Sequence, residues 1–269
     1  MEDVPEPYLI RRHVSSTLSL LSRVVGVEKV SLILVFGSVL DGCLTSVSDV
    51  DTLIVLRNVK PADVRRAAQA LKSLEPSRKG GTILDAILRS VESRTGMFQS
   101  FFVCSEESFL SGDFASIFSL SKAMSLLLAP SKLVLGSVLD GAKVVYGSLP
   151  LPFPPHPRPT PIQLIKSLLM NLLLSLSALL ISPLTGEAAK YALEAGKWSI
   201  MASYYYNYSR RISIKKLPEA LKGRLRSYAQ KLLRRREKYY NDPVILALTP
   251  IFSIMVHVLA LKRGLLKSH

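Results

Sequence analysis

The stretch VSLILVFGSVLDGCLTSVSDVDTLIVL, residues 30–56, contains two apolar runs separated by a segment rich in glycine and serine. The first run, 30–36, is β-branched and aliphatic and stops at Gly37, which is the pattern of a buried strand. The second run, 50–56, has the same composition and predicts a second strand. The segment between them predicts a loop. The stretch therefore predicts two strands joined by a loop.

The second strand begins with two aspartates separated by one residue, Asp49 and Asp51. Because successive side chains of a strand alternate between faces, both carboxylates are expected on one face, where they can bind divalent cations such as Mg²⁺. Gly37 lets the backbone approach a triphosphate, and Ser38 adds a hydroxyl for its anionic oxygens. These residues predict a metal-dependent phosphoryl-transfer site, with Asp49 and Asp51 as metal ligands and catalytic groups. The alternative is a Gly-Ser turn and two solvent-facing aspartates in an ordinary α/β domain.

This pattern resembles the DNA polymerase beta-like nucleotidyltransferase superfamily, whose signature is an apolar strand, Gly-Ser, a loop and an acidic-apolar-acidic strand. The matching residues are Phe36-Gly37-Ser38 and Ser48-Asp49-Val50-Asp51, and Gly42 matches the minimal and antibiotic-type members. The resemblance covers about residues 14–147. It implies a small mixed sheet flanked by helices, Mg²⁺, and transfer of a nucleoside monophosphate, AMP from ATP, to a hydroxyl of an unknown acceptor.

The family usually supplies a third carboxylate from a neighbouring later strand. Residues 99–104 predict that strand and contain no acid. Asp85, on an expected helix over 83–93, and Glu106, just past the strand, are the two candidates for this role. Without a third acid, the alternative function is a catalytically weak or inactive nucleotide-binding module.

The rest of the N-terminal half predicts further helices and short extended pieces. Helices are expected over 14–25 and 61–74, and extended or mixed pieces over 133–138 and 143–146. Seven prolines in residues 149–161 favour a stiff connector. The predicted organisation is therefore a nucleotidyltransferase domain over 1–150, a Pro-rich linker over 151–161 and a basic helical bundle over 162–269, which makes an α+β chain.

Charge separates these two halves. Residues 1–150 carry a net charge of +1, whereas 151–269 carry +14. In the second half, helices are expected over 161–181, 186–208, 217–240 and 243–263. Twelve Lys or Arg lie between Tyr208 and Lys238, interleaved with tyrosines. This pattern favours an anionic partner such as RNA, or a protein partner, and the alternative is a solvated basic face with tyrosines packed in the bundle.

The cysteines, the N-terminus and one long apolar segment bear on where the protein is found and on whether it forms oligomers. Two cysteines without metal-ligand spacing, Cys43 and Cys104, fit a reducing compartment, and the acidic, Pro-containing N-terminus is unlike a secretory signal. We expect a cytoplasmic protein. Residues 162–184 carry one charge and are long enough to span a bilayer, but a helix buried in a bundle or an oligomer seam gives the same pattern. Membrane insertion is disfavoured and a homodimer is possible.

Overall fold

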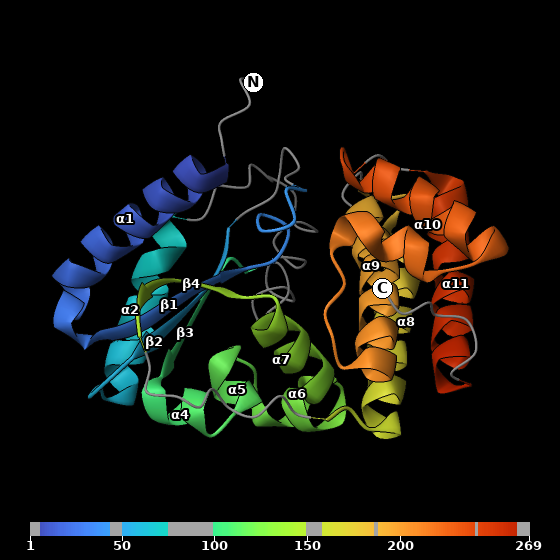
Figure 1. Cartoon of the computed structure of the whole chain (residues 1–269). Coiled ribbons are helices and arrows are strands. Elements are labelled where there is room, and N and C mark those ends of the chain that lie inside the picture. The colour runs from blue at the N-terminus through green and yellow to red at the C-terminus, as the bar shows by residue number, and fades with distance from the viewer. Residues whose placement is uncertain are drawn as a thin grey trace. The chain divides into compact units, whose positions relative to one another are not determined.

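The computed structural model describes residues 6–43, 50–74, 99–148, 158–185, 188–239 and 242–262. The chain divides into two compact units (Figure 1). The sheet unit comprises Met1–Gly42, Asp49–Ser125 and Ala142–Pro155, and the helical unit comprises Cys43–Ser48, Leu126–Gly141 and His156–His269. Most of the Pro-rich linker and the expected helix over 83–93 lie outside the described residues.

A four-stranded mixed sheet forms the centre of the sheet unit, in the order β3-β2-β1-β4. Strand β1 (Val30–Phe36) is antiparallel to both β2 (Asp51–Leu56) and β4 (Lys143–Gly147). Strand β3 (Phe101–Ser105) is parallel to β2. The two strands expected from residues 30–56 are therefore the two central strands of the sheet.

Helices cover the sheet. Helix α1 (Glu6–Val24) and helix α2 (Pro61–Leu71) pack on one face around Ile33, Ile54 and Leu56. Short helices, α4 (Glu106–Leu110) and α5 (Phe114–Ile117), contact β3, and Phe102 of β3 stacks with Phe36 and meets Phe118 edge-on. The remaining short elements of this region are η1 (Val27–Lys29), η2 (Lys72–Leu74) and α6 (Lys122–Leu127).

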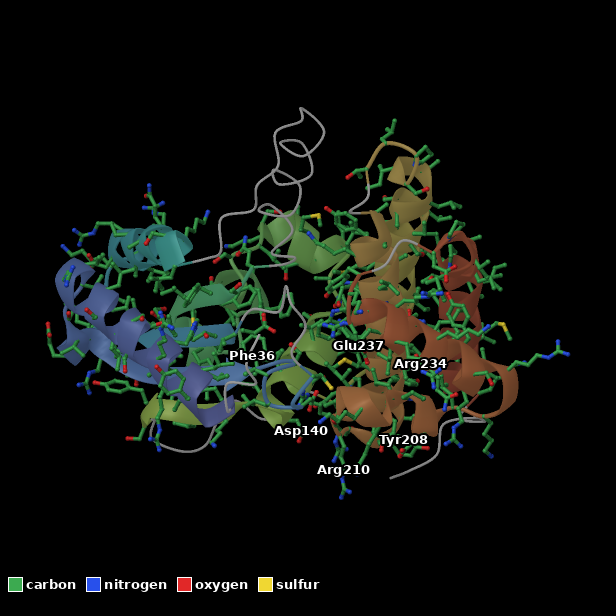
Figure 2. All side chains as sticks on the ribbon, turned by 90° about the horizontal axis from the view of Figure 1, so that it is seen from above. Phe36, Asp140, Tyr208, Arg210, Arg234 and Glu237 are labelled. Atoms are coloured by element: carbon green, nitrogen blue, oxygen red, sulfur yellow. The ribbon has the colours of Figure 1, made fainter. Side chains whose placement is uncertain are left out.

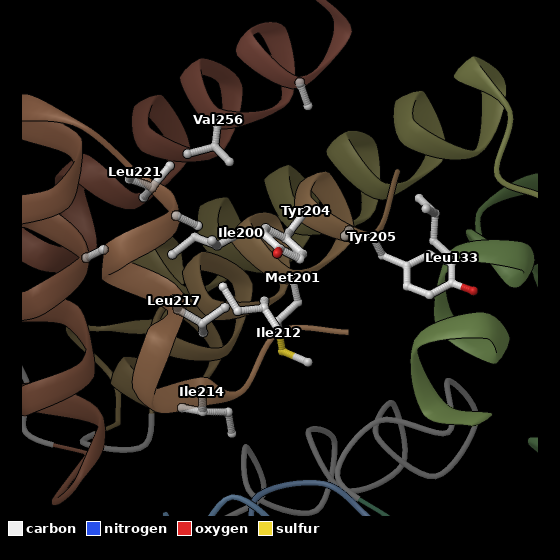
Figure 3. Close-up of a cluster of buried hydrophobic side chains, with 14 of the residues drawn as sticks. Leu133, Ile200, Met201, Tyr204, Tyr205, Ile212, Ile214, Leu217, Leu221 and Val256 are labelled. Carbon is white, nitrogen blue, oxygen red and sulfur yellow. The ribbon is translucent and has the colours of Figure 1, made fainter. Parts of the chain in front are cut away.

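The helical unit is built around α9 (Ala188–Tyr208), which is buried along most of its length. Around it pack α7 (Ser131–Asp140), α8 (Pro161–Ile181), η3 (Ile214–Ala220), α10 (Gly223–Arg236) and α11 (Pro243–Leu261). Figure 3 shows the main core, in which Ile200 and Tyr204 of α9 lie among Leu217, Leu221 and Val256.

Three expectations for these elements are corrected. Residues 133–138 are helical, not extended, because α7 packs on α9, with Tyr205 filling the space left by Gly136. The helix expected over 217–240 is two elements, η3 and α10, separated at Leu221 and Lys222, whose backbones are extended. Of the two alternatives for residues 162–184, a helix buried in the bundle or an oligomer seam, the first is wrong as a fully buried helix, because α8 packs on α9 and α11 but only 28% of its most apolar stretch is buried.

Candidate active site

Strand pairing brings the Gly37 turn and the first residue of β2 to the same edge of the sheet. Phe36, the last residue of β1, lies opposite Asp51, the first residue of β2. Directly opposed residues of antiparallel strands point to the same face. Asp51 therefore lies on the face that carries Phe36, whose side chain is marked in Figure 2, and Gly37 follows immediately.

The Asp51 carboxylate packs directly against the Gly37 backbone. Gly37 has a φ of +85°, a conformation that favours glycine. A Cβ added to Gly37 would lie 3.1 Å from Asp51 Cγ and would collide with Asp51 Oδ2. Any larger residue at position 37 would therefore combine backbone strain with displacement of the carboxylate. The structure thus gives a local reason for glycine at this position.

The Gly37 bend continues into two consecutive turns. The N–H of Asp41 donates to Ser38 O at 3.2 Å, and the N–H of Gly42 donates to Val39 O at 3.3 Å. The first N–H groups of such a turn are not used by the turn itself. Ser38 is 7% exposed and lies at the start of these turns. Ser38 and the N–H groups of these turns directly follow Gly37, against which the Asp51 carboxylate packs. Hydroxyl and N–H donors close in the chain to such a carboxylate are suited to an anionic ligand with a bound cation.

The start of β2 is held from its other face by a histidine that the sequence did not single out. His13 Nε2 lies 2.8 Å from Thr52 Oγ1, and its ring stacks on Phe101 with centroids 5.0 Å apart. The N–H of Thr52 donates to Ser100 O at 2.8 Å. These contacts fix Thr52 toward α1 and β3, so Asp51 is directed to the opposite face. A lone histidine on an amphipathic helix gives no signal of this role in the sequence.

Glu106 does not supply a third carboxylate to this site, which corrects one of the two candidates. Its Oε2 accepts a hydrogen bond from Ser31 Oγ at 2.9 Å, at the beginning of β1. Ser105, the preceding residue, pairs with Leu56, five residues beyond Asp51 along β2. At about 3.3 Å per strand residue, Glu106 lies roughly 16 Å from the Asp51 end of the sheet.

Two predicted acids cannot be placed. Asp49 and Asp85 lie outside the described residues. Among the described part of the chain, no cluster of three or more histidine, cysteine or acidic residues could hold a metal ion by itself. The structure therefore brings Gly37 and Asp51 together, with Ser38 next to Gly37 in the chain, and the roles of Asp49 and Asp85 stay predictions.

The basic segment of the helical unit is divided between the surface and the core. Exposed side chains include Arg224, Arg226, Lys231, Arg234 and Arg235 of α10, and Figure 2 marks Arg234 together with Glu237, which follows α10. Arg236 is buried instead and pairs with Glu194. Tyr204 and Tyr205 are also buried, which confirms packing in the bundle for these two tyrosines.

Two helices of this unit, α8 and α11, are long and apolar enough to cross a membrane by length and composition alone. Core helices of soluble proteins have the same length and composition.

Comparison with known proteins finds the same fold in a solved structure. Neither the protein families nor the curated proteins gave a match to the sequence. The chain is similar to the crystal structure of spectinomycin adenyltransferase AAD(9) from Enterococcus faecialis with ATP and spectinomycin, with a TM-score of 0.52 and 10% identity. The similarity covers 94% of this chain and 99% of that chain. The chain therefore has a nucleotidyltransferase-type α+β fold with an additional helical region.

Proposed function

We propose that this chain is a Mg²⁺-dependent nucleotidyltransferase that transfers a nucleoside monophosphate, AMP from ATP, to a hydroxyl of an unidentified acceptor. The observation that carries the proposal is the contact between the Asp51 carboxylate and the Gly37 backbone at the edge of the sheet. The fold shared with an adenyltransferase solved with ATP supports the proposal that this edge of the sheet takes a triphosphate and that Asp51 is a metal ligand.

The chain's own groups fit a divalent cation and a triphosphate. Asp51 would hold Mg²⁺, and Asp49 would be the second ligand by its place in the Asp-x-Asp pattern. When bound, the cation neutralises the developing charge on the phosphoryl group and its leaving oxygens. Ser38 and the N–H groups of its turn would position the triphosphate oxygens. The Gly37 bend keeps these groups close together, so catalysis rests on positioning and charge stabilisation.

The test is transfer of label from α-labelled ATP to a lysate of the native host in the presence of Mg²⁺, followed by isolation of the labelled molecule. Asp51→Asn is expected to reduce transfer by about 100-fold or more, because the metal loses a charged ligand. Glu107→Gln is the matched control, since Glu107 is an exposed carboxylate at the other end of the sheet. Unchanged transfer by Asp51→Asn, with a folded protein, would remove Asp51 from the reaction.

A second candidate function is a nucleotide-binding module without transfer, whose basic helical unit binds RNA or a protein. The position of Glu106 favours it, because that acid lies away from Asp51. Titration calorimetry with ATP and Mg²⁺ separates the two functions. Binding with micromolar or better affinity, combined with no labelled product from the lysate, supports the module over the enzyme.

A further inference from the structure

Helices α8 and α11 expose an unusually apolar surface. Fourteen large aliphatic or methionine side chains on the two helices are between 38% and 76% exposed. They are Ile162, Ile165, Leu169, Leu173, Leu176, Leu179 and Leu180 on α8, and Val244, Leu248, Ile251, Ile254, Met255, Val258 and Leu261 on α11. We call this set the α8–α11 face. The two helices pack against each other as well as against α9, so their outer sides are neighbours.

The inner side of α8 is more polar than its outer side. Ser167, Asn171 and Ser175 are buried, and His257 Nε2 of α11 lies 3.1 Å from Ser167 Oγ. Ser175 Oγ donates to Asn171 O at 2.8 Å. The polar stripe of α8 is thus hydrogen-bonded inside the unit, whereas its leucine and isoleucine side chains face outward. This is the reverse of an ordinary surface helix, whose apolar side faces the core. Burial of this outer side against a partner would remove its apolar surface from water.

The size of the α8–α11 face matches one half of a stable interface. Full burial of a large aliphatic side chain stabilises a protein by about 1.5–3 kcal/mol, and each Å² of buried apolar surface contributes about 25 cal/mol. One such side chain therefore has roughly 100 Å² of apolar surface. Fourteen such side chains, exposed by about half, present on the order of 700 Å². A typical monomer has a largest apolar patch of about 300–600 Å², and a standard interface buries about 800 Å² on each partner.

The spacing on α11 is that of a helix–helix seam. Val244, Leu248, Ile251, Met255 and Val258 follow one another at alternating intervals of four and three residues. This heptad spacing places apolar side chains along one line for packing against another helix. The exposed positions of α11 from 243 to 261 carry no aromatic, Lys or Arg side chain. Lys262, which directly follows α11, is exposed, so a helical partner is favoured by the heptad spacing and by the absence of exposed aromatic side chains from α11.

We propose that the α8–α11 face is the interface of a homodimer, in which α8 and α11 pack against α8 and α11 of a second copy about a twofold axis. A twofold interface brings the same patch of both copies together, so like charges on it would oppose association. The half of the chain from 151 to 269 carries a net +14, yet no exposed position of α8 or α11 is charged, and Lys166 of α8 is only half-exposed. The face can therefore meet its own copy without the repulsion that the rest of this basic half would cause.

The test measures the mass of the full chain in detergent-free buffer by sedimentation. We expect twice the monomer mass of 29.7 kDa. Leu248→Glu and Leu173→Glu are each expected to raise the dissociation constant by at least about 100-fold, because a carboxylate would be buried in an apolar interface. Leu110→Glu on α4 is the matched control, since Leu110 and Leu248 are both 41% exposed.

Each alternative gives a distinct result. A monomeric wild-type chain, or a dimer that both α8–α11 variants leave intact, would overturn the proposal. A monomer that sediments with phosphatidylcholine vesicles would assign the face to lipid and would also overturn it. Fluorescence of Trp198, the single tryptophan of the chain, checks that each variant keeps a folded helical unit. The result is independent of nucleotide transfer, because Asp51→Asn is expected to leave the mass unchanged.

Discussion

Glu194, Lys197 and Arg236 form a buried ion cluster in the helical unit, and each is between 6% and 7% exposed. Arg236 Nε donates to Glu194 Oε1 at 2.6 Å, Lys197 pairs with Glu194 Oε2, and Tyr239 Oη donates to Glu194 Oε1 at 3.0 Å. Burial raises the pKa of Glu194, but the charges of Lys197 and Arg236 outweigh burial and lower it to about 2. One carboxylate thus pairs with two cations, Lys197 on α9 and Arg236 on α10, and the three charges leave a net charge of +1 in the cluster.

Replacing Glu194 with Gln keeps the size of the side chain and removes the charge that both cations require. Breaking a buried ion pair on one side costs about 3–5 kcal/mol, because the remaining charges stay desolvated and lose their carboxylate. For a urea slope of about 2 kcal/mol per M, this destabilisation lowers the unfolding midpoint by roughly 2 M. The same cluster is expected to lose stability as the pH falls from about 4.5 toward 2, where the folded carboxylate becomes protonated.

Urea unfolding followed by Trp198 fluorescence measures this effect in the helical unit, because Trp198 lies on α9 next to Lys197. Glu237→Gln is the matched control at an exposed acid. Replacing all three charged residues with apolar ones of similar volume is expected to recover most of the loss. If Glu194→Gln lowers the free energy of unfolding by less than about 1 kcal/mol, the carboxylate does not stabilise the two buried cations as described.

Three further outcomes follow from the described residues. Gly37→Ala is expected to lower nucleotide transfer by about 100-fold, because the added Cβ displaces Asp51. Gly223→Ala is its control, since Gly223 has a φ of +55° and no atom within 4 Å of an added Cβ, so that variant adds only about 1 kcal/mol of backbone strain. Equal losses of transfer activity in the two variants would contradict this. Burial lowers the pKa of His257 to about 4, so the free energy of unfolding of the helical unit should fall by up to about 3 kcal/mol as the pH falls from 6.5 to 4. In urea titrations, the unfolding free energy of His257→Gln should depend less steeply on pH. Burial, followed by the charge of Asp113, raises the pKa of Cys104 to about 12, so iodoacetamide should modify Cys104 only after unfolding; mass spectrometry showing rapid modification of the native chain would contradict the burial.

The arrangement around Gly37 shows how far local sequence information extends. An apolar run that stops at Gly-Ser and a second apolar run over 50–56 were sufficient to predict two strands, and the structure adds that the two are antiparallel partners. Antiparallel pairing of neighbouring strands then places the end of the first beside the start of the second, so the proximity of Gly37 and Asp51 follows from short-range order. Glu106 could not be placed in this way. Its distance from Asp51 depends on the parallel register of β3 with β2, which is a contact between distant segments.

The helical half shows the same division. Apolar composition and proline positions predicted α8 and α11 closely, because helix bounds depend on nearby residues. Composition did not reveal which side of each helix faces the interior. In α8, hydrogen bonding to His257 draws the polar stripe inward, and this leaves the leucines outside. The burial of Arg236 within a run of exposed arginines likewise depends on Glu194, which lies 42 residues away in the chain.

The sequence by itself determined the two strands within residues 30–36 and 50–56, the charge contrast between the halves and the residue types of the candidate site. These properties depend on side-chain period, turn chemistry and composition, all of which act over a few residues. Only the tertiary structure decided that Glu106 bonds to Ser31, that His13 holds Thr52 and that α8 turns its leucines outward. Those outcomes are set by packing and hydrogen bonding between segments far apart in the chain, where burial of a polar group is tolerated only with a specific partner.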